Sequence, residues 1–196
     1  YFNEFRIACS GRAGIYSQQG GSLYLKSTTS IGYEKDYPKA GVELVGVAVT
    51  NGAIKIGSQP AKNKVSGAAF LRARGCTFKS SDSIQALNGG IGEFVDCRLS
   101  GGYLRPSAAS MSLVGSVFTA SGSGALYPGA AAAGVGTLAI TNSVVDVGEK
   151  TYLGGVSGSC GEIDLSGSFW TNKYQVYVGS ADGSTGLVRS ANSVLT

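Results

Sequence analysis

The chain has 196 residues, of which 31 are glycine, 43% are hydrophobic and 14% are charged, with 16 Lys and Arg against 12 Asp and Glu. This length fits one substantial domain, and the periodic placement of apolar residues argues against disorder. No apolar run of about 18 residues is present, so no membrane insertion is expected. The chain has no His and no CxxC motif, so neither a metal site, a cofactor nor a His-based triad is predicted.

The positive charge is concentrated in the first half of the chain. Residues 1–105 hold 13 Lys and Arg against 7 Asp and Glu, a net charge of +6, whereas residues 106–196 hold 3 against 5, a net charge of −2. A basic half favours acidic partners such as anionic polysaccharides. The basic residues are scattered and form no dense cluster, so no nucleic-acid partner is expected.

The first part of the chain is the least regular. Alternation at Phe5–Ile7 and Leu23–Leu25 predicts strands, and the charged segment 33–39 predicts an excursion from them. We expect irregular N-terminal turns over residues 1–41 and a regular solenoid over residues 42–196, the whole being part of a longer chain.

From residue 42 onward one pattern recurs, and its clearest copy is Leu138–Val145. A short alternating apolar run leads to a Gly, Asn or Asp anchor, and a second short run follows. The anchors lie 19 to 29 residues apart, at Gly46, Gly75, Asp96, Gly115, Asn142, Gly167 and Asn192. A fixed core in a repeat of variable length predicts a stacked fold. Because Gly, Asn and Asp enter the left-handed region most cheaply, each anchor is predicted to be a tight corner with positive φ.

Alternation around the anchor defines an inward face at positions −4, −2, +1 and +3. Position +1 holds small residues, and these are expected to stack in one inward column: Cys76, Cys97, Ser116, Ser143, Ser168 and Ser193. Cys76 and Cys97 are therefore interpreted as small buried hydrophobes. For the four cysteines, Cys9, Cys76, Cys97 and Cys160, free thiols are favoured over a disulfide. Free thiols favour folding in a reducing cytoplasm.

A third strand follows each corner after a Gly/Ser stretch, near residues 54, 85, 104, 127, 153 and 177. Three strands per turn with one constant corner predict an all-β, right-handed single-stranded parallel β-helix of about seven to eight turns. A β-sandwich would require hairpins of matched length, and no segment has a helical period long enough to compete.

The repeat, with its Asn/Gly corner and inward Ser column, resembles the right-handed parallel β-helix superfamily (pectin-lyase-like), which includes pectate lyases and bacteriophage tailspikes and depolymerases. The resemblance covers roughly residues 42–196. Pectate lyases use clustered acids for calcium, and no such cluster can be placed here. Low regularity, free cysteines and a Gly/Ser-rich surface resemble the tailspike type, which implies a homotrimer that binds and often cleaves bacterial surface polysaccharide. Autotransporter passengers share the fold but usually avoid cysteine.

The outer face of the third strand is the candidate glycan-binding site. Aromatic and basic residues come one per turn there, and the site residues are Tyr103, Arg105, Tyr127, Tyr152 and Tyr177. Tyrosine offers an apolar face and a hydroxyl, which suit a sugar. The alternative is that tyrosine is favoured in strands and the stacked rings support one another.

The acidic residues give no firm catalytic assignment. Glu43, Arg72 and Glu93 fill one slot of consecutive turns with alternating sign, and Asp164 precedes Arg189 in the same slot, so charge ladders are predicted. Asp146 and Glu149 are the better catalytic candidates, although the catalytic residues stay unassigned.

Apolar residues on both sides of the corner predict an oligomer interface. Its members are Val95, Val114, Val117, Val144, Phe169 and Val194.

The leading functional prediction is a tailspike-type domain on a virion tail, folded in the host cytoplasm, that recognises and in some cases cleaves a bacterial surface glycan. The alternatives are a secreted or cell-surface polysaccharide lyase or hydrolase of the pectate-lyase kind, or a β-helical shaft or adhesin segment without a glycan site.

Overall fold

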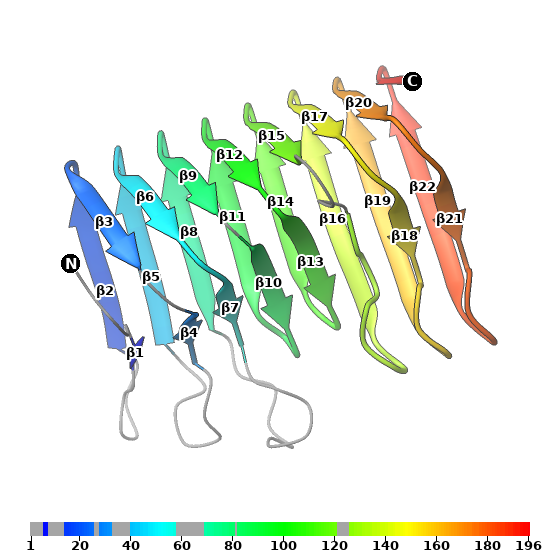
Figure 1. The fold of residues 1–196 in the computed structure, drawn as a ribbon, viewed down its shortest axis with the longest axis horizontal. Coiled ribbons are helices and arrows are strands. Elements are labelled where there is room, and N and C mark those ends of the chain that lie inside the picture. The colour runs from blue at the N-terminus through cyan, green and yellow to red at the C-terminus, as the bar shows by residue number, and fades with distance from the viewer. Residues whose placement is uncertain are drawn as a thin grey trace.

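The structure is a computed structural model that describes residues 6–7, 14–25, 28–32, 40–57, 69–80, 82–120 and 126–196. Within these ranges every named element is a β-strand, and the strand pairs are parallel. The turns stack side by side along the long axis, with the N-terminal strands at one end and the C-terminal strands at the other (Figure 1). Cys9 and the charged segment 33–39 lie outside the described residues. The predicted all-β parallel solenoid is confirmed.

The solenoid has three sides, of which the first and the second are each formed by a single sheet. The first consists of β2 (Gly14–Gln19), β5 (Ala40–Val45), β8 (Phe70–Arg74), β11 (Ile91–Val95), β14 (Ser110–Val114), β16 (Val135–Thr141), β19 (Cys160–Ser166) and β22 (Thr185–Ala191). The second consists of β3 (Ser22–Leu25), β6 (Ala48–Asn51), β9 (Thr77–Ser80), β12 (Arg98–Gly101), β15 (Val117–Ala120), β17 (Val144–Val147), β20 (Phe169–Asn172) and β23 (Val194–Leu195).

The third side is divided into two sheets. One holds β1 (Arg6–Ile7), β4 (Thr29–Ile31), β7 (Ile54–Ile56), β10 (Ser83–Leu87) and β13 (Tyr103–Ser107), and the other holds β18 (Thr151–Leu153) and β21 (Val176–Val178). Leu126 joins them, because it forms a parallel bridge with Leu104 and its carbonyl accepts a hydrogen bond of 3.0 Å from the Tyr152 N–H. The third side therefore continues along the solenoid.

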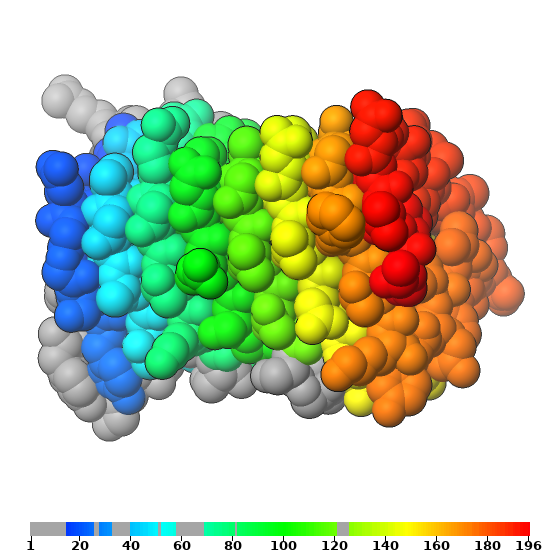
Figure 2. Space-filling model, turned by 90° about the horizontal axis from the view of Figure 1, so that it is seen from above, coloured from blue at the N-terminus to red at the C-terminus, as the bar shows by residue number. Residues whose placement is uncertain are grey.

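The number of complete turns is lower than expected. About six turns of the described chain carry all three strands, from β2–β3–β4 to β19–β20–β21, against the seven to eight that the sequence predicted. The turn of β14 and β15 has only the bridge at Leu126 on its third side, and β22 and β23 have no third strand after them. Seen from above, successive turns form bands of colour from one end to the other (Figure 2).

The predicted corner is present in every repeat. All seven anchors have positive φ, between 48° at Asn142 and 62° at Gly46. The corner side chains also reach the next turn, because a Cβ placed on Gly167 would meet Asn142 Oδ1 at 2.5 Å. A second left-handed corner lies at the end of the third strand, where Asn88 and Ala108 have φ of 44° and 50°. The sequence pattern did not reveal this second corner, since glycine, asparagine and alanine all occur there.

The core is a set of inward columns, as alternation predicted. Leu138, Ile140 and Val145 are each at most 1% exposed, and Phe78 packs edge-on against Phe94 at 5.5 Å. In the last turn the corresponding members, such as Leu195 at 45%, are exposed because nothing stacks on them in this structure.

The inward column of small residues is confirmed, and it is also a hydrogen-bond ladder. The Ser116 N–H donates to Ser143 Oγ at 3.0 Å, and the Ser143 N–H donates to Ser168 Oγ at 3.1 Å. Each hydroxyl then donates across its own corner, as Ser143 Oγ does to the Thr141 carbonyl at 2.7 Å. Cys97 takes the same place, because its sulfur accepts from the Cys76 N–H at 3.4 Å. Each oxygen or sulfur of the column thus accepts a hydrogen bond from a buried backbone N–H that has no partner on a neighbouring strand.

The thiols are free, as predicted for the described cysteines Cys76, Cys97 and Cys160. Burial raises the pKa of the Cys97 thiol to about 11, and hydrogen bonds from the backbone of Cys76 and at Val95 only partly oppose it. A thiol that stays protonated is a poor nucleophile, so this part of the column is structural.

Candidate functional site

The candidate glycan-binding residues lie on the third side of the solenoid, where strand register places most of them in one outward row. Gln85 pairs with Lys55 on one side and with Arg105 on the other. The bridge between Leu104 and Leu126 then sets Tyr127 beside Arg105, and Tyr152 pairs with Tyr177. We call this set the tyrosine row; its members from the N-terminal end are Lys55, Gln85, Arg105, Tyr127, Tyr152 and Tyr177.

Three of the four predicted tyrosines form a regular stack within this row. The ring centroids of Tyr127 and Tyr152 are 4.8 Å apart with an interplanar angle of 16°, and those of Tyr152 and Tyr177 are 4.9 Å apart with an angle of 7°. Tyr103 lies in the neighbouring slot, because its strand partner is Ser83. Its ring meets Tyr127 edge-on at 5.5 Å and 71°. The predicted ladder therefore exists, with Arg105 rather than Tyr103 in register.

The stacking decides which part of each tyrosine a ligand can contact. Neighbouring rings along the axis are nearly parallel and at stacking distance, so each ring covers a face of the next. The side chains of Tyr127, Tyr152 and Tyr177 are half-buried. The row consequently presents ring edges and hydroxyl groups, one per turn. The face contact with sugars that the sequence suggested is not available between stacked members.

Two cations flank the stack. Arg105 precedes Tyr127, and its Nη2 donates a long hydrogen bond of 3.4 Å to the Ala130 carbonyl. At the other end, Lys150 Nζ lies 5.7 Å from the ring centroid of Tyr177. Burial raises the pKa of the Tyr127 hydroxyl, neighbouring Tyr152 and Tyr103 add to this, and the Arg105 charge partly opposes it. The Tyr127 phenol is therefore a neutral donor and acceptor at physiological pH.

The predicted charge ladders are confirmed on the first sheet. Arg72 Nε lies 2.7 Å from Glu93 Oε2, and Arg72 Nη1 lies 3.8 Å from Glu43 Oε1. Arg189 Nη1 likewise contacts Asp164 at 2.9 Å and Glu162 at 3.2 Å. These four carboxylates are occupied as partners of arginines, which fits a structural role.

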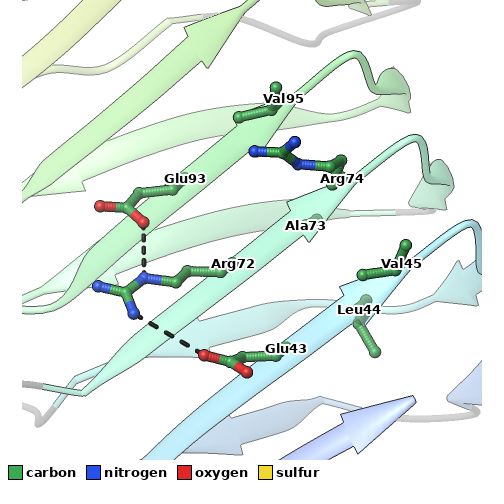
Figure 3. A pocket seen from close by; sticks show the side chains of 8 residues that line it. All are labelled: Glu43, Leu44, Val45, Arg72, Ala73, Arg74, Glu93 and Val95. Carbon is green, nitrogen blue, oxygen red and sulfur yellow. Dashed lines mark hydrogen bonds and ion pairs between the residues drawn. The ribbon is translucent and has the colours of Figure 1, made fainter. Parts of the chain in front are cut away.

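A shallow groove of about 230 Å³ runs beside the first of these ladders (Figure 3). Arg72 reaches across one side of it between Glu43 and Glu93. The other side is a row in which Arg74 pairs in register with Val45 and Val95. This groove was not identified from the sequence, because it depends on which outward rows become neighbours.

The two acids regarded as better catalytic candidates lie three residues apart in the chain, one in a strand and one in the turn that follows it. Asp146 projects from β17 in the second sheet, in register with Thr119 and Thr171, whereas Glu149 lies in the following turn, next to Lys150. In the described part of the chain no group of three His, Cys, Asp or Glu side chains is arranged to hold a metal ion. The described residues also contain no helix long and apolar enough to cross a membrane.

The predicted interface residues form two apolar rows that border the corner. Val95 and Val114 pair in register at the end of the first sheet. The second row begins just past the corner on the second sheet, and its members pair in succession: Val117, Val144, Phe169 and Val194. Phe169 is 57% exposed and Val194 is 47% exposed.

Fold and surface together define the chain as a parallel β-solenoid that carries an outward aromatic row with flanking cations. Searches of protein-family models, curated proteins and solved structures give no match to this chain.

Proposed function

We propose that this solenoid is a receptor-binding domain of the tailspike type, which binds a bacterial surface polysaccharide along the tyrosine row. The observation that carries the proposal is the in-register stack of Tyr127, Tyr152 and Tyr177, which presents one hydroxyl edge per turn. Turns of a solenoid rise by about 4.8 Å, the spacing of neighbouring strands. One sugar unit is about as long as one turn, so a chain lying along the axis meets one hydroxyl per unit.

The mode of contact follows from the ring orientation. Tyrosine hydroxyls both donate and accept hydrogen bonds, as sugar hydroxyls do. A row of such groups fixed at equal spacing binds with little loss of side-chain freedom, because the stacked rings are already ordered. Tyr103, which meets Tyr127 at 71°, adds a ring in another orientation at the N-terminal end of the stack.

Binding rather than cleavage is the activity that this surface favours. Glycoside hydrolysis uses two carboxyl groups roughly 5 to 10 Å apart across the scissile bond. Four carboxylates are paired with arginines on the first sheet, away from the row: Glu43, Glu93, Glu162 and Asp164. Of the two better catalytic candidates, Asp146 belongs to the second sheet, and Glu149 is a single carboxylate in the turn beside Lys150. The wider proposal, a homotrimer on a virion tail, adds that the apolar rows beside the corner pack against further copies of the chain.

The test uses two substitutions at the centre of the row. Tyr152→Phe keeps the stack and removes one hydroxyl, so binding should weaken about two- to tenfold, the equivalent of one lost hydrogen bond of about 0.5–1.5 kcal/mol, while the melting temperature stays nearly unchanged. Tyr152→Ala removes the ring as well and should lower both affinity and stability. Calorimetric titration against a panel of purified capsules and lipopolysaccharides, with thermal melts of the same proteins, measures both.

Tyr24→Phe is the matched control, because Tyr24 is an exposed tyrosine on β3 of the second sheet. It should leave affinity unchanged. If Tyr152→Ala lowers stability and neither substitution at Tyr152 alters binding, the row is a structural stack only. If no polysaccharide in the panel binds the wild-type protein, the shaft interpretation replaces the proposal.

A further inference from the structure

We infer that the polysaccharide bound by the tyrosine row carries negatively charged groups, and that Arg105 holds one of them at the N-terminal end of the stack. This inference rests on the proposed function and adds the charge of the ligand to it. The inference is based on the guanidinium of Arg105, which is in register with the stacked tyrosines. Most of its N–H groups have no hydrogen-bond acceptor.

The environment of Arg105 has two unsatisfied polar groups. Arg105 Nε is buried without a hydrogen-bond partner, and so is Ser107 Oγ, two residues further along β13 and on the same side by strand alternation. Arg105 Nη2 makes only the long bond to the Ala130 carbonyl. Among the described residues no carboxylate forms an ion pair with this arginine, in contrast to Arg72 and Arg189. Partly buried cations are normally paired, because an unpaired charge there costs free energy.

The surroundings of the row supply further positive charge. Lys55 lies two positions beyond Arg105, with the neutral Gln85 between them. Lys150 stands at the far end, near Tyr177, but Glu149 is its chain neighbour and offsets its charge. The N-terminal end of the row is thus the more positive end. Because Arg105 Nε is buried, an anionic group beside Tyr127 would meet the terminal nitrogens Nη1 and Nη2, a planar pair of donors that suits carboxylate and phosphate oxygens.

The geometry also sets a minimum length for the ligand. Arg105 and Tyr177 are three turns apart, so a glycan that contacts Arg105 and all three stacked hydroxyls spans about four sugar units. Shorter fragments should lose either the anion contact or the last hydroxyl.

The experiment compares the polysaccharides of the panel before and after their charge is removed, by reduction of carboxylates to alcohols or by dephosphorylation. For the wild-type protein, neutralisation should weaken binding about tenfold, which corresponds to about 1.4 kcal/mol. For Arg105→Gln, native and neutralised forms should bind within about twofold of each other. Raising the salt concentration from 50 to 500 mM should weaken binding of the native form only.

Lys79→Gln is the matched control, because it removes the same charge from an exposed position on β9 of the second sheet. It should keep the preference for the native form. Equal affinity of native and neutralised polysaccharide for the wild-type protein overturns the inference and leaves the proposed function standing, as does an equal loss of preference in Lys79→Gln. A panel in which nothing binds overturns both, and the pair Tyr152→Phe and Arg105→Gln separates loss of hydroxyl contact from loss of charge contact.

Discussion

One residue per turn, at the corner between the first and second sheets, adopts a left-handed backbone conformation. The corner residue has positive φ in all seven repeats, including Asp96, Asn142 and Asn192, which are not glycine. A positive φ costs conformational free energy for every residue with a Cβ. The cost is smallest for Asn and Asp, because their short polar side chains form local hydrogen bonds. A β-branched residue has no such compensation. The same choice of Gly, Asn or Asp is therefore repeated at the corner of each turn.

Asn142→Val should lower the free energy of unfolding by about 1–2 kcal/mol, because valine is strained at a φ of 48°. Chemical denaturation of the wild type and the variant measures the change. Asn142→Gly is the control, and we expect it to be nearly neutral because glycine occupies the same corner at Gly115 and Gly167. A midpoint for Asn142→Val equal to that of the wild type would contradict the argument.

At the scale of the element, the contacts of a side chain come mainly from equivalent positions in the neighbouring turns rather than from its own strand. The small inward residues next to the corner accept a hydrogen bond from a buried backbone N–H of the preceding turn. The acceptor is the sulfur in Cys97 and the hydroxyl oxygen in Ser143 and Ser168. Similarly, the tyrosine row acquires its properties from stacking, since only ring edges and hydroxyls stay available. The function of a side chain in this fold is thus set by its neighbours one turn away.

Ser143→Ala should destabilise the protein by about 1–3 kcal/mol, because it leaves the buried Ser116 N–H without its acceptor. Thermal and chemical unfolding of the variant give the value. Ser143→Cys should recover part of the loss, since cysteine fills the same slot and accepts the equivalent bond at Cys97. An alanine variant as stable as the wild type would show that the ladder contributes no net stability.

At the scale of the whole molecule, the surface is divided into faces of different character. The first sheet carries the ion-pair ladders, the third side carries the tyrosine row, and the apolar rows border the corner between the first and second sheets. Apolar rows of this kind fit a partner surface, and we propose that the partner is another copy of the chain.

Phe169→Glu should therefore lower the oligomeric state, because it places a charge in the centre of the second-sheet apolar row. Sedimentation equilibrium of the wild type and the variant measures the mass. Thr77→Glu is the control, since Thr77 lies in the same outward row on β9, away from its apolar part. A wild-type protein that sediments as a monomer would refute the assembly proposal.

The candidate site was only partly predictable from sequence. The tyrosines and Arg105 were identified as outward residues of the third strand, since alternation around a buried leucine such as Leu104 fixes the side. Which of Tyr103 and Arg105 stands in register with Tyr127 was not predictable, because the segment before each third strand varies in length. Pairing of Leu104 with Leu126 decides it. The ring orientation and the unpaired state of Arg105 also depend on neighbours one turn away.

The sequence alone determined the solenoid, its corner and its inward columns. These features rest on local requirements, namely positive φ at one position and strict alternation around it, and both are repeated in every turn and so are visible as a pattern. Only the tertiary structure decided the second corner at Asn88 and Ala108, the hydrogen-bond ladder through Ser143, and the register of the tyrosine row on the third side. The physical reason is that these depend on register between segments about 20 to 30 residues apart, which the variable third side leaves open until the strands pair.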